Sequence, residues 1–313
     1  MTNTAMITTG LLDLVLTPLQ YPFMQNALAV AVISAAICGM LSAWLVLMGW
    51  SLMGEAVANS ILPGVVLAFI LGIPLGIGAF IFGMAAVALI GALGQTTTLK
   101  RDTSIGVVFT SLFALGLVLM STVTTQTHLQ HILFGNVLGT SRADLYQVAA
   151  LGTITAAVLL VKRRDFTLVA FDRIYAQAIG LPVGLLTTVL LMLLALTTIT
   201  ALQTLGVILV VAILVIPGAT AFLLVRSFGA MLAVSSAVGA IAAVAGVYAS
   251  YWLDISTGGS IVLAASAQFL LAYLLSPRRG LLPRLWRGGR RRAVSAGPGD
   301  GHVSRSPLGR TPQ

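Results

Sequence analysis

The sequence predicts an all-α integral membrane protein, a polytopic bundle of about eight to nine transmembrane helices. Of its 313 residues, 58% are hydrophobic and only 8% are charged, and the mean hydropathy is +1.04. Stretches such as 183–201 and 205–225 are apolar on every side, whereas the outer helices of a soluble protein need a polar face. These observations exclude a large soluble helical bundle.

The apolar stretches give the number of spans. A bilayer core about 30 Å thick requires about 20 apolar helical residues for each crossing. The second stretch is the least regular, because Glu55, Asn59 and Pro63 interrupt it. The predicted spans cover residues 26–48, 55–73, 75–94, 104–122, 143–161, 183–202, 205–225, 230–252 and 259–276.

Charge divides the chain into three parts. Nine Arg and one Asp follow Pro277, a net charge of +8, whereas the first 277 residues carry eight basic and seven acidic residues, a net charge of +1. We expect an N-terminal segment (1–25), a transmembrane domain (26–276) and a basic, disordered tail (277–313) near anionic membrane lipids. No aromatic or folded motif accompanies the arginines, so nucleic acid is not an expected partner.

The remaining basic residues predict the orientation. If the spans alternate, the basic residues near the span ends fall on one side of the membrane, with Arg142 as the exception. Cytoplasmic segments are enriched in Lys and Arg, so this side is the expected cytoplasm and the C-terminus is expected there. The residues that agree are Lys100, Arg101, Lys162, Arg163, Arg164, Arg173, Arg226, Arg278 and Arg279.

Glu55 is the one glutamate of the chain, and it lies in the stretch SLMGEAVANSILPGVV (51–66). A spacing of four places Glu55, Asn59 and Pro63 on one helical face. Pro63 also frees the carbonyl of Asn59 from its usual hydrogen bond. A carboxylate in a bilayer is costly unless it meets a cation, a partner or water, so it indicates a transport pathway. Alternatively, Glu55 caps the N-terminus of its helix; chemistry alone leaves both interpretations open.

Two other stretches are candidates for function. His128 and His131 have helical spacing, but no Cys, Asp or Glu lies within eight residues of them, which disfavours a structural metal site. The amphipathic segment 163–184 predicts a short helix that Asp172 caps and Gly180 ends, either a docking surface or a solvated loop. Catalytic motifs such as a Walker A loop are absent, so energy for transport would come from another subunit or an ion gradient.

Six stretches in order resemble the permeases of bacterial ABC importers for manganese, zinc and iron, the ABC-3 family. The resemblance extends over about residues 25–276. The stretches are SLMGEAVANSILPGVVLAF (51–69), KRDTSIGVVFTSLFALGLVLMS (100–121), HILFGNVLG (131–139), FDRIYAQAIGLPVG (171–184), TLGVILVVAILVIPGATA (204–221) and YWLDISTGGSIVL (251–263).

The resemblance implies a non-enzymatic transport subunit in the bacterial plasma membrane. It implies a homodimer with the pathway on its two-fold axis, cytoplasmic ATP-hydrolysing subunits and an extracytoplasmic metal-binding protein. The divalent metal ion is then the transported substrate, and no permanently bound cofactor is expected. Segment 171–182 matches the family's coupling segment, which gives as expected ATPase contacts Asp172, Ala176, Ala178 and Gly180.

The opening motif departs from the family pattern. The usual form resembles GDAISHAVLPG, in which an Asp and, four residues later, a His hold the metal during passage; here these positions are Glu55 and Asn59. An amide oxygen in place of a ring nitrogen favours harder ions such as manganese over zinc. The rival functions are a permease for a metal chelate or siderophore, and an ATP-independent metal channel or carrier.

Overall fold

The computed structural model describes residues 17–96, 101–122 and 139–276, and these ranges form helices and no strand. Within these ranges, nine helical spans are long and apolar enough to cross a membrane, which is the predicted number. The pair His128 and His131 and the tail 277–313 lie outside the described residues. The helices are α2 (Pro22–Leu47), α3 (Ser51–Ser60), α4 (Leu62–Leu71), α5 (Leu75–Thr96), α6 (Arg101–Ser121), α8 (Arg142–Val161), α9 (Arg163–Phe171), α10 (Arg173–Ala178), α11 (Val183–Leu205), α12 (Val207–Leu224), α13 (Phe228–Leu253) and α14 (Thr257–Leu275).

The second span differs from its predicted limits of 55–73. It begins four residues earlier, at Ser51, and it is broken at Ile61 into α3 and α4. Pro63 lies at the start of α4 and has no N–H to donate to the carbonyl of Asn59, so the regular hydrogen-bond ladder stops there. The span ends at Gly72, which has a φ of 67° and can adopt it without the cost of a Cβ.

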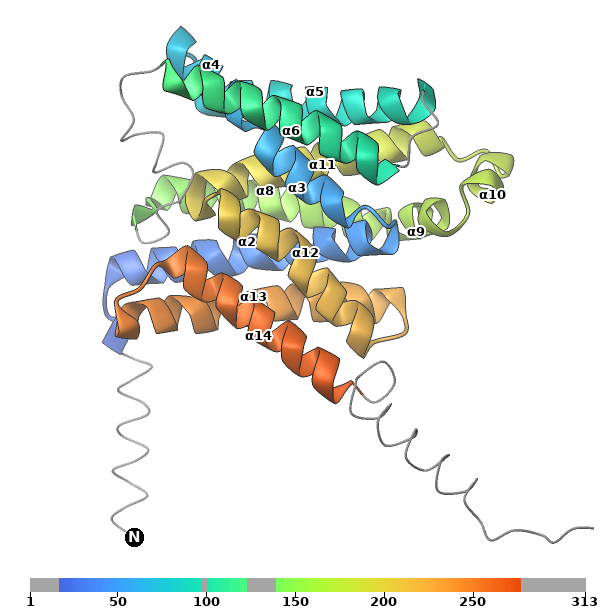
Figure 1. Cartoon of the computed structure of the whole chain (residues 1–313). Coiled ribbons are helices and arrows are strands. Elements are labelled where there is room, and N and C mark those ends of the chain that lie inside the picture. The colour runs from blue at the N-terminus through green and yellow to red at the C-terminus, as the bar shows by residue number, and fades with distance from the viewer. Residues whose placement is uncertain (1–16, 97–100, 123–138, 277–313) are drawn as a thin grey trace, which may run out of the picture.

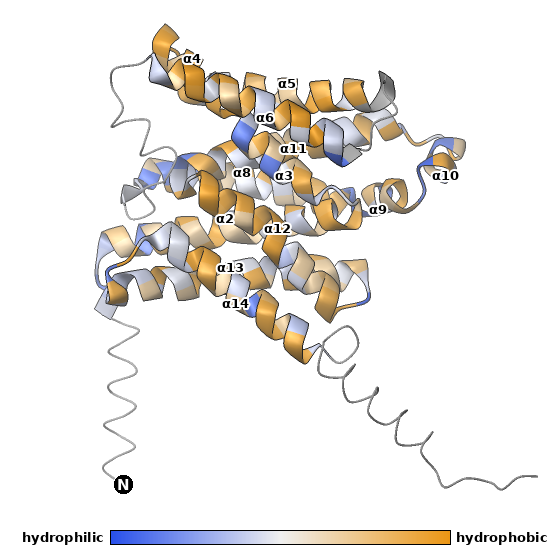
Figure 2. Ribbon diagram, in the orientation of Figure 1, coloured by the Kyte–Doolittle hydropathy of each residue, from blue (hydrophilic) through white to orange (hydrophobic). Residues whose placement is uncertain are grey.

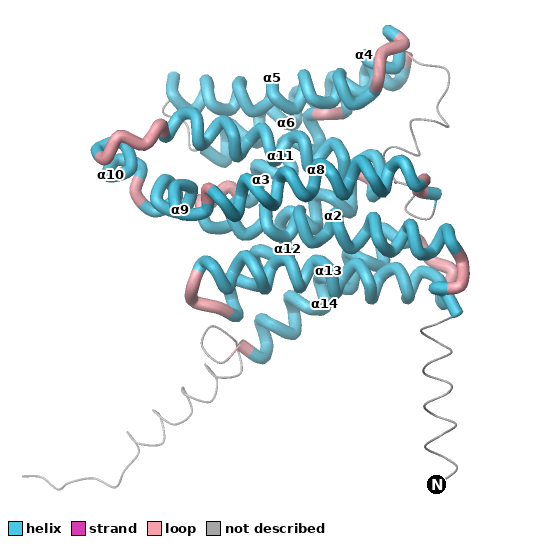
Figure 3. Tube along the Cα trace, turned by 180° about the vertical axis from the view of Figure 1, so that it is seen from behind, coloured by secondary structure: helices cyan, strands magenta, loops and turns pink. Residues whose placement is uncertain are grey.

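The helices are arranged around α2 (Figure 1). α2 packs against α12 and α13 and also against α8 and α11. α4, α5 and α6 lie together on one side of the bundle, and α13 and α14 lie on the opposite side. Seen from behind, α9 and α10 project from one end of the bundle (Figure 3). The fold therefore separates a long apolar body from a small helical extension at one end.

Small residues allow the closest helix contacts, as expected for packing inside a membrane. Where α4 meets α5, a Cβ on Gly64 would lie 2.7 Å from the carbonyl carbon of Gly78. Where α2 meets α13, a Cβ on Gly39 would lie 2.6 Å from the carbonyl oxygen of Ser235. Apolar residues occur along the long helices (Figure 2), and many of them, such as Leu71 and Leu263, are exposed, which suits contact with lipid or with other transmembrane helices.

Candidate functional site

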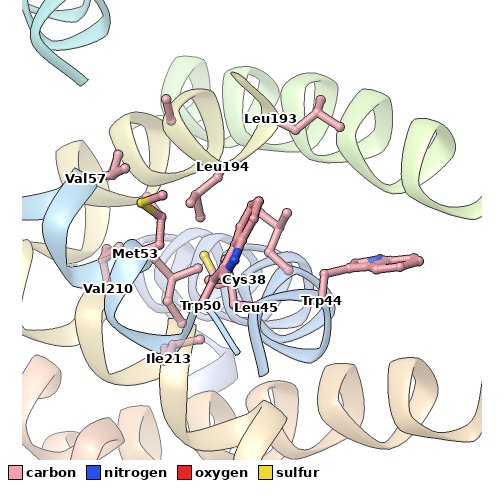
Figure 4. Packing of buried hydrophobic residues seen from close by; sticks show 14 of the residues in the cluster. Cys38, Trp44, Leu45, Trp50, Met53, Val57, Leu193, Leu194, Val210 and Ile213 are labelled. Carbon is pink, nitrogen blue, oxygen red and sulfur yellow. The ribbon is translucent and has the colours of Figure 1, made fainter. Parts of the chain in front are cut away.

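Helix α3 directs an apolar face inward and a polar stripe away from the core. Met53 and Val57 belong to the buried cluster that also contains Leu194 and Val210 (Figure 4). Met53 is 2% exposed and Val57 is fully buried. A step of two residues turns about 200° around a helix. Burial of Met53 and Val57 on one face therefore directs Glu55 and Asn59, each two residues further along, toward the opposite face.

The neighbours of α3 leave this polar stripe uncovered. α3 lies between α6 and α12 (Figure 1). α12 packs against Gly54, where a Cβ would lie 3.1 Å from the Cβ of Leu214, and α6 crosses the start of α4, where a Cβ on Gly116 would lie 3.0 Å from Pro63. Glu55 and Asn59 are partly exposed, although the residues next to each of them are buried.

Neither the side chain of Glu55 nor that of Asn59 makes a hydrogen bond or an ion pair with any described part of the chain. No Lys or Arg occurs before Lys100 in the sequence, so no cation comes from the neighbouring α2 or α5. Within the described ranges, no group of three His, Cys, Asp or Glu side chains could hold a metal ion. One copy thus offers one carboxylate and one amide, fewer ligands than a desolvated hard cation takes.

The structure tests one of the two interpretations of Glu55, the N-terminal cap. Trp50 occupies the N-cap of α3, and the first turn of the helix contains no acidic residue. Glu55 lies in the second turn, beyond the first turn in which the helix dipole favours an acid. The capping interpretation is therefore wrong, because the helix begins four residues earlier than the apolar pattern indicates.

The segment after α9 has the predicted local structure. Asp172 is the N-cap of α10, where its Oδ1 accepts a hydrogen bond from the N–H of Tyr175 at 2.9 Å. Gly180 follows the helix with a φ of 84°. Asp172, Ala178 and Gly180 are exposed, whereas Ala176 is fully buried. Ala176 therefore supports the segment from within the chain and offers no exposed side chain.

A hydrogen bond that the sequence does not predict joins this segment to α11, next to the start of α3. Arg173 Nη2 donates a hydrogen bond to Thr187 Oγ1 at 3.1 Å. Both residues line a cavity of about 70 Å³ together with Met48 and Trp50, the N-cap of α3. The helix that carries Glu55 therefore begins beside α10. The signal available in the sequence was a lone Trp directly before the polar motif.

These features define a class of protein: a polytopic membrane permease with a polar stripe on a broken span and a short helical extension at one end. Residues 20–276 match the ABC 3 transport family, and the chain belongs to this family. The family prediction is confirmed. The chain is a permease subunit of an ABC transporter, and the ATPase is a separate subunit.

Three similar proteins support this assignment. The manganese transport system membrane protein MntC of Halalkalibacterium halodurans is 43% identical over 279 residues, 89% of this chain and 96% of that protein. The chelated iron transport system membrane protein YfeD of Yersinia pestis is 47% identical over 264 residues, 84% of this chain and 89% of that protein. The solved structure of PsaBC from Streptococcus pneumoniae in complex with Fab has a TM-score of 0.80 and 35% identity, and the match covers 88% of this chain and 99% of that chain.

Proposed function

We propose that this permease imports a divalent metal ion, with manganese favoured over zinc or iron, and that Glu55 and Asn59 receive the ion during passage. The observation that carries the proposal is the uncovered stripe on α3: a carboxylate and an amide at membrane depth, without a partner in the described part of their own chain. A carboxylate in that setting is costly unless a cation or water meets it. Relatives whose names refer to manganese and to chelated iron support the metal class.

The ion is held between two copies of the chain. One copy supplies two oxygen ligands, whereas a desolvated divalent cation takes about six or more. Two α3 helices facing each other across a two-fold axis supply four side chains, and water or backbone carbonyls supply the rest. This arrangement explains why the polar stripe of α3 is uncovered in one copy, because the same stripe of the second copy covers it in the dimer.

ATP hydrolysis acts through α10. A cytoplasmic ATPase subunit contacts the segment through its exposed residues Asp172, Ala178 and Gly180, and Ala176 anchors the segment to the permease. Movement of α10 then changes the start of α3, since Arg173 and Trp50 line the same cavity. Alternating access follows: an extracytoplasmic binding protein delivers the ion, and closure of the ATPase subunits reorients the stripe.

The orientation of the permease follows from its charges. The starts of α6, α9, α10 and α13 lie at one end of the bundle (Figure 1), next to most of the basic residues of the described chain. The positive-inside rule makes that end cytoplasmic, in a bacterial plasma membrane, and places the C-terminal tail there. Arg142, at the start of α8, lies at the opposite end.

Metal uptake by the complete transporter tests the proposal. Glu55→Gln removes the charge with little change in size, so manganese uptake should fall by at least tenfold, equivalent to about 1.4 kcal/mol. Glu55→Asp keeps the carboxylate and should retain part of the activity. Ser51→Ala, one turn earlier on α3, is the matched control. Full uptake by Glu55→Gln would exclude the proposed ion route.

A parallel measurement separates the alternative cargo and energy source. The YfeD relative is named for chelated iron, so uptake of free manganese should be compared with uptake of an iron chelate. Uptake of the chelate alone would favour the chelate permease. Uptake that continues without the ATPase subunit would favour an independent channel or carrier.

A further inference from the structure

Away from the α3 stripe, a pocket of about 440 Å³ lies between α9 and the start of α13. Its volume falls in the range of small-molecule sites. α13 contributes Phe228 and Gly229. α9 contributes one face, made of Arg163, Arg164, Thr167, Leu168 and Phe171.

The polar groups around this pocket are mainly hydrogen-bond donors, the two guanidinium groups and the first N–H groups of α13. Asp165, the carboxylate of α9, pairs with Lys162 at 3.1 Å and leaves both pocket arginines without an acidic partner in the described chain. The N-cap of α13, Ser227, makes no side-chain capping bond, so the first N–H groups of this 26-residue helix add partial positive charge. Two guanidinium groups beside such N–H groups suit an anion.

A buried tryptophan connects the two helices that form the pocket. Trp44 of α2 is fully buried. Its ring contacts Phe166 of α9 with centroids 5.5 Å apart and Phe228 of α13 with centroids 4.3 Å apart. The Trp44 Nε1 has no hydrogen-bond acceptor among the described residues. These ring contacts hold α9 and the start of α13 in fixed positions, so the pocket between them is preformed.

We propose that this pocket binds the phosphate group of an anionic phospholipid in the cytoplasmic leaflet. The pocket lies where headgroups lie, since α9 begins two residues after α8 ends at Val161, a residue 79% exposed. The other half of the lining is apolar, and Phe171 is 71% exposed, which suits the glycerol and acyl part of a lipid rather than a free ion. Basic pockets between transmembrane helices on this side are suited to lipid headgroups.

The observations favour a lipid over a second protein. The ATPase contact proposed above uses α10, which lies beyond α9 at the end of the bundle (Figures 1 and 3). Leu224, 47% exposed, ends α12 only four residues before Phe228. An acyl chain from the pocket can continue past the exposed Leu224 at the end of α12, whereas a soluble subunit cannot enter the lipid layer.

The test is retention of phosphatidylglycerol by the full-length chain, purified into nanodiscs of phosphatidylglycerol diluted in phosphatidylcholine and analysed by native mass spectrometry. In the double variant Arg163→Gln/Arg164→Gln, the preference for phosphatidylglycerol over phosphatidylcholine should fall by about tenfold or more. Lys162→Gln is the matched control: it removes a neighbouring charge outside the pocket lining and should keep the preference. Equal loss in both variants would mean general surface attraction and would overturn the proposal.

A second variant keeps both arginines and tests the cavity itself. A Cβ on Gly229 would meet no atom within 4 Å, so Gly229→Leu should fold and should fill the pocket. We expect it to lower lipid retention as the double variant does. Displacement of the lipid by inorganic phosphate would show a site for free phosphate. Protection of Arg163 and Arg164 from chemical modification by the ATPase subunit, but not by the lipid, would show a protein contact. Either result would refute the lipid site.

Discussion

Ser42 of α2 and Gly218 of α12 join their two helices at the one proline inside α12. The Ser42 Oγ accepts the N–H of Gly218 at 2.9 Å and donates to the carbonyl of Val215 at 3.2 Å. Pro217 has no N–H and interrupts the ladder of α12. A side chain of α2 thus satisfies backbone groups at the break. α12 also packs against Gly54, so this contact supports the helix that carries Glu55.

Ser42→Ala should lower the free energy of unfolding. The variant leaves the N–H of Gly218 without the Ser42 acceptor, and a hydrogen bond between transmembrane helices contributes about 0.6 to 1.7 kcal/mol. Thermal unfolding of the purified permease in one detergent measures the effect. Ser34→Ala is the control, because the Ser34 hydroxyl is buried without a partner, and its removal should cost less. Equal destabilisation would show that the Ser42 bonds add nothing.

Gly64→Ala should destabilise the contact between α4 and α5. The new Cβ would lie 2.7 Å from the carbonyl carbon of Gly78 and 2.9 Å from the Cβ of Phe82. Forced separation of well-packed elements costs about 1 to 3 kcal/mol. Gly91→Ala, on α5, is the control: its new Cβ meets no atom within 4 Å, so the variant should be neutral or slightly stabilising. The yield of monodisperse protein and its thermal stability distinguish the two variants, and an intact Gly64→Ala would disprove the close contact.

Asn59→His should shift the transporter toward zinc. Imidazole nitrogen is a softer ligand than an amide oxygen and suits zinc better than manganese. Competition between the two metals for uptake should change on the order of tenfold in favour of zinc. Asn59→Gln keeps an amide oxygen and should retain the preference for manganese. Unchanged discrimination in Asn59→His would refute a role for residue 59 in metal choice.

Asp172→Ala should weaken α10. The helix has six residues, so the capping bond from Tyr175 to Asp172 is a large part of its local stability, and loss of an N-cap costs about 0.5 to 2 kcal/mol. We expect weaker co-purification of the ATPase subunit and lower metal-stimulated ATP hydrolysis. Asp172→Ser preserves a cap and should restore both. A Ser variant as defective as Ala would instead indicate that the carboxylate itself contacts the partner.

Much of the fold follows directly from the sequence. Nine apolar stretches of span length predict nine transmembrane helices, because the length and hydropathy needed to cross a bilayer are properties of each segment alone. The cap at Asp172 and the turn at Gly180 are also local, since they depend on the chemistry of adjacent residues. Pro63 indicates a disturbance of the second span, although the limits of that span and its break at Ile61 were not predicted.

The site depends on contacts between segments far apart in the chain. The spacing of Glu55 and Asn59 determines by itself that they share a helical face. Only the tertiary structure decides that this face is open and that Glu55 is not a cap. Met53 and Val57 turn inward against α11 and α12, and α6 and α12 flank α3 without covering its polar stripe. The physical reason is that helix pattern is local, whereas burial depends on neighbours from separate segments of the chain, here α6, α11 and α12.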